Sequence, residues 1–268
     1  MTSRPLRRLP GRVAAAFGFA ILLASWQTLS GVVRLWLPRF GIFVPTPFEV
    51  AEAGYYLITT TQFWGSFFLS NLRVLVGWLL ACTLAIPMGV LLARNQLSGR
   101  IVLPVLDFCR YIPVAALVPL SILWLGVEER QKIVILTAGT FFQALVLVVD
   151  AIKRVPTPYL EVGLTLGVSG NRLAGRVLFP AAWPAIFDAC RVCAGLTWSY
   201  LLVAELVAAE LGLGYQIIRA QRFLKTDQIF FIIGVLGLIG FCYDRALLKL
   251  RNYVVPWDLL GRLHRDNE

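Results

Sequence analysis

The ionisable residues of this 268-residue chain are too few and too scattered to form a catalytic centre. Its single histidine, His264, lies in a polar tail, which disfavours histidine acid–base chemistry and most zinc sites. Cys190 and Cys193 form a CxxC pair without a second ligand pair, so we interpret them as packing residues on a helix. The sequence contains no GxxxxGKS/T phosphate loop, so ATP is not expected to bind here. We predict no catalytic, cofactor or metal site on this chain.

Some charged residues fall inside apolar stretches, where each of them needs a partner. Asp107 and Arg110 lie three residues apart, and Asp188 and Arg191 repeat this spacing, so each pair can meet on one face of a helix. Alternatively, Arg110 and Arg191 line a pathway and attract an anion. Glu205 either fixes an outer gate or faces water.

Two further groups of residues lie in the later apolar stretches. One stretch is interrupted by three side chains with polar groups: Trp198, Ser199 and Tyr200. They could line a cavity or pack between helices. Glycines recur at every third residue of the last stretch, which favours close helix packing: Gly234, Gly237 and Gly240.

The composition places these residues in a membrane protein. Hydrophobic residues make up 58% of the chain and charged residues 15%, against about 45–50% and about 25% in soluble domains. This excludes a disordered chain, a coiled coil and a soluble enzyme with one packed core. The net charge of +10 indicates charges at a membrane face rather than a nucleic-acid-binding surface.

Apolar windows of about 20 residues predict an all-α, polytopic protein with six transmembrane helices. The predicted spans are residues 13–33, 71–93, 101–126, 132–151, 185–209 and 228–248. Prolines should kink the third span: Pro104, Pro113 and Pro119. We expect residues 45–70 to form an outer amphipathic segment. The first window is too long for a signal peptide and lacks a clean cleavage site, so we predict a retained helix.

Lys and Arg indicate the orientation of these spans. They are more frequent in the segments on the side that both termini share, so both termini are predicted to be cytoplasmic. The opposite segments carry Arg34, Arg39, Arg73, Arg130, Lys132, Arg219, Arg222 and Lys225.

One cytoplasmic connection, residues 153–184, has a pattern of its own. Pro158 suits the first turn of a helix that Gly167 can end. Ser169 can cap a second short helix that reaches Leu178. Two prolines are expected to break the backbone before the next span: Pro180 and Pro184. Such a stiff projection with apolar residues should dock on a soluble cytoplasmic protein.

This connection resembles the signature of ABC importer permeases, which is Glu-Ala-Ala, three residues, Gly, nine residues and Ile-x-Leu-Pro. The chain has Glu161-Val162-Gly163, Gly167 and Val177-Leu178-Phe179-Pro180 at the same spacing. Further segments are similar to the nitrate/sulfonate/taurine type of this family: residues 110–126, Ala204-Glu205-Leu206, Gly212-Leu213-Gly214-Tyr215 and Val255-Pro256-Trp257.

The resemblance implies a type I importer permease: one transmembrane domain over residues 1–268, with a core near 65–250. The implied protein partners are two ATPase subunits, which hold ATP and Mg, a second permease copy and an extracytoplasmic substrate-binding protein. The implied location is the lipid bilayer of a bacterial inner membrane. Nucleic acid is not an implied partner. It implies alternating access driven through the 153–184 connection. The implied coupling residues are Leu160, Glu161, Leu164, Gly167, Val168 and Pro180.

Two other classes of function would require different sequence features. A self-sufficient channel or secondary transporter should show paired broken repeats or a run of buried charges near the midplane. An integral-membrane enzyme should show a titratable constellation, which the sequence lacks. The resemblance allows nitrate, sulfonates, taurine, bicarbonate or another small solute as cargo.

Overall fold

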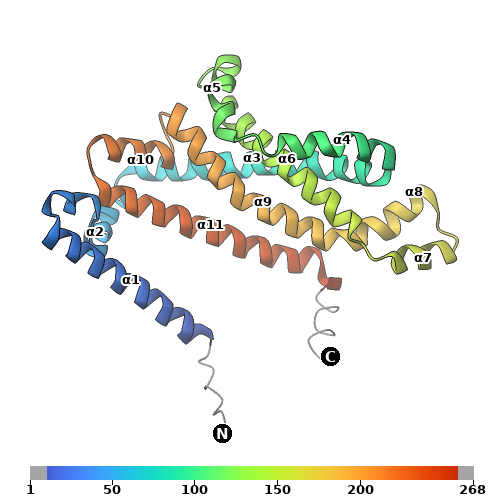
Figure 1. Ribbon diagram of the computed structural model, residues 1–268, viewed down its shortest axis with the longest axis horizontal. Coiled ribbons are helices and arrows are strands. Elements are labelled where there is room, and N and C mark those ends of the chain that lie inside the picture. The colour runs from blue at the N-terminus through green and yellow to red at the C-terminus, as the bar shows by residue number, and fades with distance from the viewer. Residues whose placement is uncertain (1–10, 259–268) are drawn as a thin grey trace, which may run out of the picture. The chain divides into compact units, whose positions relative to one another are not determined.

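The computed structural model describes residues 11–258, and within them every regular element is a helix (Figure 1). This confirms the predicted all-α class. His264 and the basic residues before residue 11, which contribute to the orientation argument, lie outside the described residues. The elements in chain order are α1 (Gly11–Trp36), the 3-10 helix η1 (Pro38–Phe43), α2 (Pro47–Ile58), α3 (Thr61–Arg94), α4 (Gln96–Cys109), α5 (Val114–Leu125), α6 (Glu129–Lys153), α7 (Thr157–Thr165), α8 (Gly170–Leu173), the π-helix η2 (Ala174–Leu178), α9 (Phe179–Ala208), α10 (Leu213–Arg222) and α11 (Thr226–Val254).

The described chain packs as two compact units. Unit 1 comprises residues 11–63 and 216–235, and unit 2 comprises residues 64–215 and 236–258. The division concerns packing only, because α3, α10 and α11 each contribute residues to both units.

In unit 1, α2 is fixed at its start by a capping box. The Thr46 hydroxyl accepts from the Glu49 amide over 3.3 Å, and the Glu49 carboxylate accepts from the Thr46 amide over 2.9 Å. Pro47 occupies the first turn, where a missing backbone donor costs nothing. The indole of Trp26 donates to the Pro45 carbonyl over 3.0 Å, which joins α1 to the start of α2.

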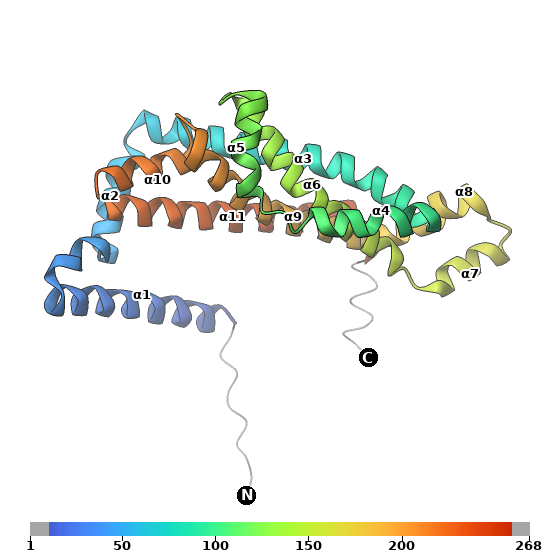
Figure 2. The same cartoon turned by 45° about the horizontal axis from the view of Figure 1, so that its top comes forward.

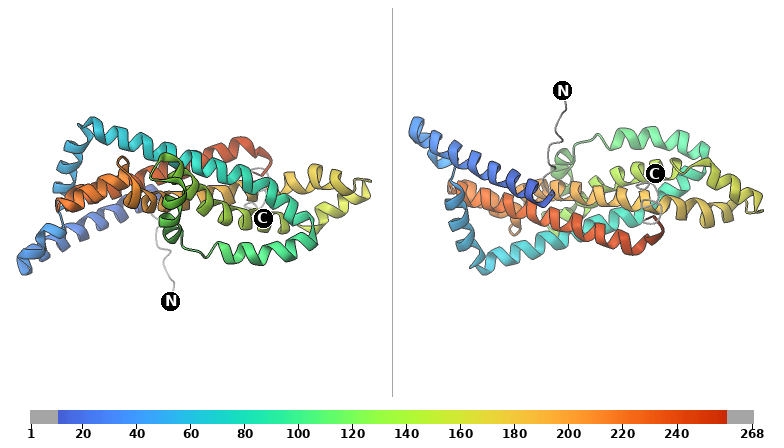
Figure 3. Two further views of the ribbon diagram at one scale, coloured as in Figure 1. Left: turned by 90° about the horizontal axis from the view of Figure 1, so that it is seen from above. Right: turned by 90° about the horizontal axis from the view of Figure 1, so that it is seen from below.

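In unit 2, α6 and α9 lie side by side, with α3 packed against them (Figures 1 and 3). Gly77 and Gly89 of α3 allow this approach, because a Cβ would lie 2.7 Å from Leu136 Cβ at the first and 2.5 Å from Val148 Cγ1 at the second. The Trp78 indole donates to the Cys190 carbonyl over 2.8 Å and so links α3 to α9. The three helices therefore form a closely packed core.

Among residues 11–258, five helices are long and apolar enough to cross a membrane, within α1, α3, α6, the α8–α9 run and α11. The predicted third span, residues 101–126, is not one helix but two, α4 and α5, which meet at 91° (Figure 2). Pro113 lacks an N–H donor and disfavours a helical residue before it, so the break falls at residues 110–113. Pro104 and Pro119 stay inside α4 and α5. There are six spans if this bent pair counts as one.

The predicted outer segment, residues 45–70, is divided between two helices. Its first part forms α2, and the rest belongs to the first turns of α3, which continues without a break into the predicted second span. At 1.5 Å per residue the 34 residues of α3 extend about 50 Å, more than the roughly 30 Å of a hydrocarbon core. The start of α3 can therefore project beyond the bilayer, where the exposed Thr61 and Gln62 meet water, whereas Ser66 and Ser70 are buried in the protein.

Candidate functional site

α7 and α8 form a helical hairpin, residues 157–173, at the end of unit 2 where α6 ends and α9 begins (Figures 1 and 3). Pro158 lies in the first turn of α7. Gly167 follows with φ +76°, and the amide of Val168 donates to the Gly163 carbonyl over 3.0 Å. These bonds are those of a Schellman helix end, so the predicted first helix and its glycine terminator are confirmed.

The second half of the connection differs from the prediction. Ser169 does stand at the N-cap of α8, but its side chain makes no capping hydrogen bond. The expected break at Pro180 and Pro184 is wrong, because the backbone stays helical from α8 through η2 into α9. A π turn shifts the hydrogen-bond register by one residue, so Pro180, the second residue after η2, can fill the position that lacks a backbone bond.

The hairpin is held together at Gly163. A Cβ there would lie 2.6 Å from Leu173 Cδ1 and 3.2 Å from Val177 Cγ2, so α7 packs with its backbone against the next helix. Most apolar side chains of α7 and its C-cap instead face outward: Tyr159, Val162, Leu164 and Leu166. Among the predicted coupling residues, Leu160 and Val168 are half-buried, and Glu161, Leu164, Gly167 and Pro180 are exposed.

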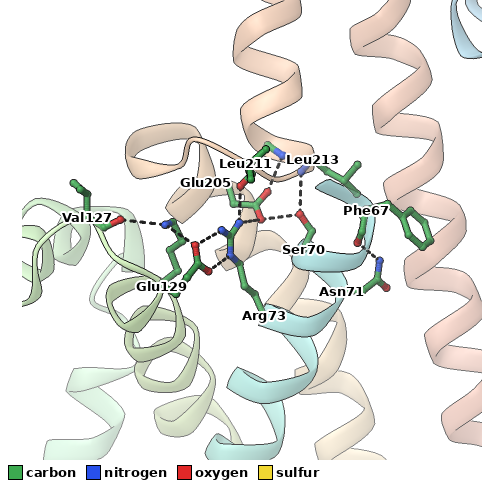
Figure 4. Close-up of polar contacts among 11 residues, drawn as sticks. Phe67, Ser70, Asn71, Arg73, Val127, Glu129, Glu205, Leu211 and Leu213 are labelled. Carbon is green, nitrogen blue, oxygen red and sulfur yellow. Dashed lines mark hydrogen bonds and ion pairs between the residues drawn. The ribbon is translucent and has the colours of Figure 1, made fainter. Parts of the chain in front are cut away.

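A buried ionic cluster lies at the opposite end of α6 and α9 (Figure 4). Arg73 of α3 binds Glu129 of α6 through two bonds of 2.5 and 2.6 Å, and its Nη1 lies 2.6 Å from Glu205 Oε1 of α9. Lys132 Nζ lies 3.2 Å from Glu129 Oε1. Arg73 and Glu205 are 2% and 1% exposed, so the suggestion that Glu205 faces water is wrong.

The cluster also shapes the connection between α9 and α10. The Leu211 carbonyl accepts from Arg73 over 2.8 Å, and the Gly214 amide donates to Glu205 over 2.8 Å. Gly212 adopts φ +137°, and a Cβ there would lie 2.4 Å from the Glu205 carboxyl carbon. The Gly-x-Gly sequence therefore lets the backbone wrap around Glu205. Ser70 completes the wrapping, since it donates to Glu205 and accepts from the Leu213 amide.

The cluster is balanced in charge and rich in hydrogen bonds. Arg73 and Lys132 offset Glu129 and Glu205, so no excess charge remains to recruit a charged solute. Such a network stabilises one arrangement of three helix ends, because Arg73 and Glu205 are buried and removing either one leaves the other as a buried charge that has lost a partner, whereas Glu129 is half exposed. We interpret it as a clamp rather than a binding site.

A second set of ion pairs joins α9 to α11 within unit 2. The predicted pair Asp188–Arg191 is confirmed at 3.9 Å, although Arg191 lies nearer to Asp244, at 3.1 Å. Arg251, which is 3% exposed, lies 2.9 Å from Asp188 and 2.6 Å from Asp258. α9 is thus tied by charges near both of its ends.

The remaining predicted pathway residues lie on α9 and in the break that follows α4. Arg110 pairs with Asp107 at 3.2 Å, as predicted. On α9, Ser199 is exposed, and Tyr200 is half-buried with its ring against Gly139. Trp198 is buried edge-on to Tyr243, and its indole nitrogen has no partner among the described residues.

Sequence reasoning missed Arg73, Glu129 and Lys132 as members of a cluster, because the two cations were counted as charges of outer connections. A signal was nevertheless present. Arg73 is a lone cation between two apolar windows, and a charge in that position requires a partner such as Glu205. Which carboxylate supplies it depends on how α3, α6 and α9 pack.

Comparison with known proteins adds to this geometry. Residues 85–250 match the family described as binding-protein-dependent transport system inner membrane component. The chain is 30% identical over 254 residues to the putative aliphatic sulfonates transport permease protein SsuC of Escherichia coli. The alignment covers 95% of this chain and 95% of that protein. It is 29% identical over 243 residues to the taurine transport system permease protein TauC of Escherichia coli, covering 89% of this chain and 87% of that protein.

A solved structure of an inward-facing MetNI methionine ABC transporter has a similar fold. Its matching chain superposes with a TM-score of 0.62 at 20% identity, over 70% of this chain and 94% of that chain. This likeness concerns the fold alone.

Proposed function

The chain belongs to the family of binding-protein-dependent transport system inner membrane components, and from this we propose that it is the permease through which an importer moves a small anion of the sulfonate kind. The sulfonate and taurine permeases among its relatives support the class of cargo. The observation that carries the coupling mechanism is the α7–α8 hairpin, with exposed apolar side chains on a closely packed support.

The hairpin is suited to transmit force. Exposed apolar side chains such as Leu164 and Leu166 gain free energy when a partner covers them. Because Gly163 locks α7 onto α8 and the helix then runs unbroken into α9, a displacement of the hairpin reaches α9 as a rigid movement. We propose that cytoplasmic ATPase subunits dock here and that ATP and Mg are bound by them alone.

The assembly that we propose has two permease copies, two ATPase subunits and one extracytoplasmic binding protein. The family description itself refers to dependence on a binding protein. For the second permease copy, the support is α11, where added Cβ atoms at Gly234, Gly237 and Gly240 would meet nothing within 4 Å in the described chain. Small residues left open in this way permit close approach of another helix in lipid.

We propose that the solute passes beside α9, where Trp198, Ser199 and Tyr200 lie. The exposed hydroxyl of Ser199 supports this, since it can hydrogen-bond a passing solute, whereas the indole nitrogen of Trp198 is buried. Arg110 and Arg191 are each engaged by a carboxylate, so we assign them a structural role in preference to attracting the anion. Glu205 belongs to the clamp at the other end of α9, which we propose is the outer gate.

The test is ATP-driven uptake in liposomes that contain the permease, its ATPase subunits and its binding protein. We expect uptake of a radiolabelled alkanesulfonate only when all three and ATP are present. Leu164→Asp should reduce co-purification of the ATPase and uptake by about tenfold, because it puts a charge into the apolar contact. Thr165→Ala, one residue away and also exposed, should leave both within about twofold. Uptake without ATPase would instead favour a self-sufficient channel or secondary transporter.

A further inference from the structure

A polar cavity of about 280 Å³ lies within unit 1, between α2, α10 and the start of α11. α10 presents one face to it, because its three lining residues recur at the spacing i, i+3 and i+4, and Phe223 follows directly after the helix: Gln216, Arg219, Ala220 and Phe223. The other lining residues are Tyr56, Leu57, Thr60, Gln62, Lys225 and Gln228. Gln62 and Gln228 lie in the first turns of α3 and α11, so the cavity is at the ends of two spans.

The lining carries two cations and no carboxylate. Arg219 donates one bond, from Nη1 to Gln62 Oε1, so most of its five N–H groups remain available to a ligand. Because Gln62 accepts through its oxygen, its amide N–H₂ group is left as a further donor. The Thr60 hydroxyl donates to the Leu57 carbonyl over 2.7 Å and so offers a ligand only lone pairs. The donors therefore gather around Arg219.

The cavity also has an apolar part, formed by Leu57, Ala220 and Phe223. Its volume is near the lower limit for ligand sites, which are about 300 Å³ or larger for drug-sized molecules. A compact oxyanion with a short alkyl chain satisfies both parts, since its oxygens meet the donors and its carbons meet the apolar residues.

A neighbouring groove of about 450 Å³ has the opposite charge. It shares Tyr56, Lys225 and Gln228 with the cavity and adds the carboxylates of Glu49, Glu52 and Asp227. Lys225 lines both the cavity and the acidic groove, so its charge can be neutralised by the carboxylates of the groove. Arg219 lines the cavity and not the groove. Arg219 is accordingly the residue by which the site should be judged.

We propose that this cavity is a binding site for a short alkanesulfonate, with Arg219 holding the oxyanion, on this chain itself rather than on the binding protein. The inference rests on the proposed function for the kind of anion. A phospholipid phosphate has the same oxyanion chemistry, so the experiment has to separate a soluble ligand from a lipid headgroup.

The test is calorimetric titration of the full-length permease with ethanesulfonate in nanodiscs of phosphatidylcholine only. We expect saturable binding that Arg219→Gln weakens by about tenfold or more, because a charge-assisted hydrogen bond is lost. Arg222→Gln is the matched control: it removes the same charge from the same helix but lines neither cavity, and it should change affinity by less than about twofold. Lys225→Gln provides a second variant should Arg219→Gln fail to fold, and it should also weaken binding.

Three results would overturn the inference: no saturable binding to the wild type, equal losses in the Arg219 and Arg222 variants, or no loss in the Arg219 and Lys225 variants. A fourth is loss of binding when phosphatidylglycerol replaces part of the lipid, which would assign the cavity to a lipid headgroup. ATP-driven uptake by the complete assembly is measured in parallel. Uptake without binding to the permease refutes only this site, whereas binding without uptake in any assembly refutes the proposed function.

Discussion

Arg73 connects three helices through one side chain. It contacts the carboxylates of Glu129 on α6 and Glu205 on α9, and it donates to the Leu211 carbonyl in the following connection (Figure 4). A guanidinium suits this role better than an ammonium, because its planar fork can bind one carboxylate with two bonds and still reach another. The clamp consequently depends on the type of residue as well as on its charge.

The prediction at this scale is that Arg73→Met lowers the free energy of unfolding of the purified permease by about 3–5 kcal/mol, because the buried Glu205 loses its ionic partner, whereas the half-exposed Glu129 keeps Lys132. Denaturant or thermal unfolding in detergent measures the change. The control is Arg130→Gln, whose pair with Glu128 is 3.9 Å long and exposed, and which should cost less than about 1 kcal/mol. Equal losses in the two variants would show that the cluster is no clamp.

At the scale of elements, the α7–α8 hairpin owes its rigidity to close contact between the α7 backbone at Gly163 and the side chains of Leu173 and Val177. Gly163 stands where the signature of this family has alanine, and Leu173 and Val177 fill the space that a methyl group would need. The glycine in place of the alanine of the signature therefore makes room for the side chains of Leu173 and Val177.

We predict that Gly163→Ala forces α7 away from Leu173 and uncouples ATP hydrolysis from uptake in the reconstituted assembly. The ratio of solute moved to ATP hydrolysed should fall by about threefold or more, since the hairpin then moves independently of α9. Gly175→Ala is the control, because an added Cβ there meets nothing within 4 Å. An unchanged ratio in the Gly163 variant would mean that the hairpin transmits no movement.

The capping of α2 leads to a prediction about pH. Arg34 and the Thr46 amide hydrogen-bond the Glu49 carboxylate, and the Arg34 bond in particular holds the pKa of that carboxyl below its ordinary value of 4.5. A lowered pKa stabilises the folded state above the ordinary value, and this contribution is lost as the pH falls through the lowered pKa. The pair is more than one-third exposed, so solvent screens it and the effect is small.

The measurement is thermal unfolding of the wild type and of Glu49→Gln at about pH 7 and about pH 3. The variant should melt below the wild type at the higher pH, and the two should converge at the lower pH. Glu52→Gln is the control on the same helix, since Glu52 makes no ion pair within residues 11–258. The melting temperature of this variant should differ from that of the wild type by the same amount at both pH values. A gap that persists in acid would contradict the assignment.

At the scale of the whole molecule, α6 and α9 separate the hairpin from the clamp. From Glu129 to Lys153, α6 is about 36 Å long at 1.5 Å per residue, close to the thickness of a bilayer core. The hairpin follows the end of α6, and the clamp includes its first residue. The hairpin and the clamp therefore lie at opposite ends of one helix of bilayer length, which fits the proposed coupling element and outer gate.

The number of crossings decides where the termini lie. If α4 and α5 together cross the membrane, there are six spans and both termini share one side; if the bent pair re-enters, there are five and the termini lie on opposite sides. We predict six crossings with both termini in the cytoplasm. Single cysteines at the two ends, in a background without the five native cysteines, should both resist a membrane-impermeant maleimide in intact cells. Labelling of one end alone would establish a re-entrant pair.

Some features of this protein depend on neighbours along the chain, and others depend on tertiary packing. Apolar windows, Gly167 and the i, i+3 charge pairs depend on neighbours along the chain, so the helical class, the end of α7 and the Asp107–Arg110 contact could be predicted from the sequence. The sequence alone does not predict the 91° break at Pro113 or the continuous helix through Pro180. A proline removes one backbone donor, and whether the helix breaks there depends on how the surrounding structure compensates for the lost hydrogen bond. The Arg73–Glu205 contact and the Arg219 cavity join residues more than 130 positions apart, and only the packing of the helices decides which distant charges meet.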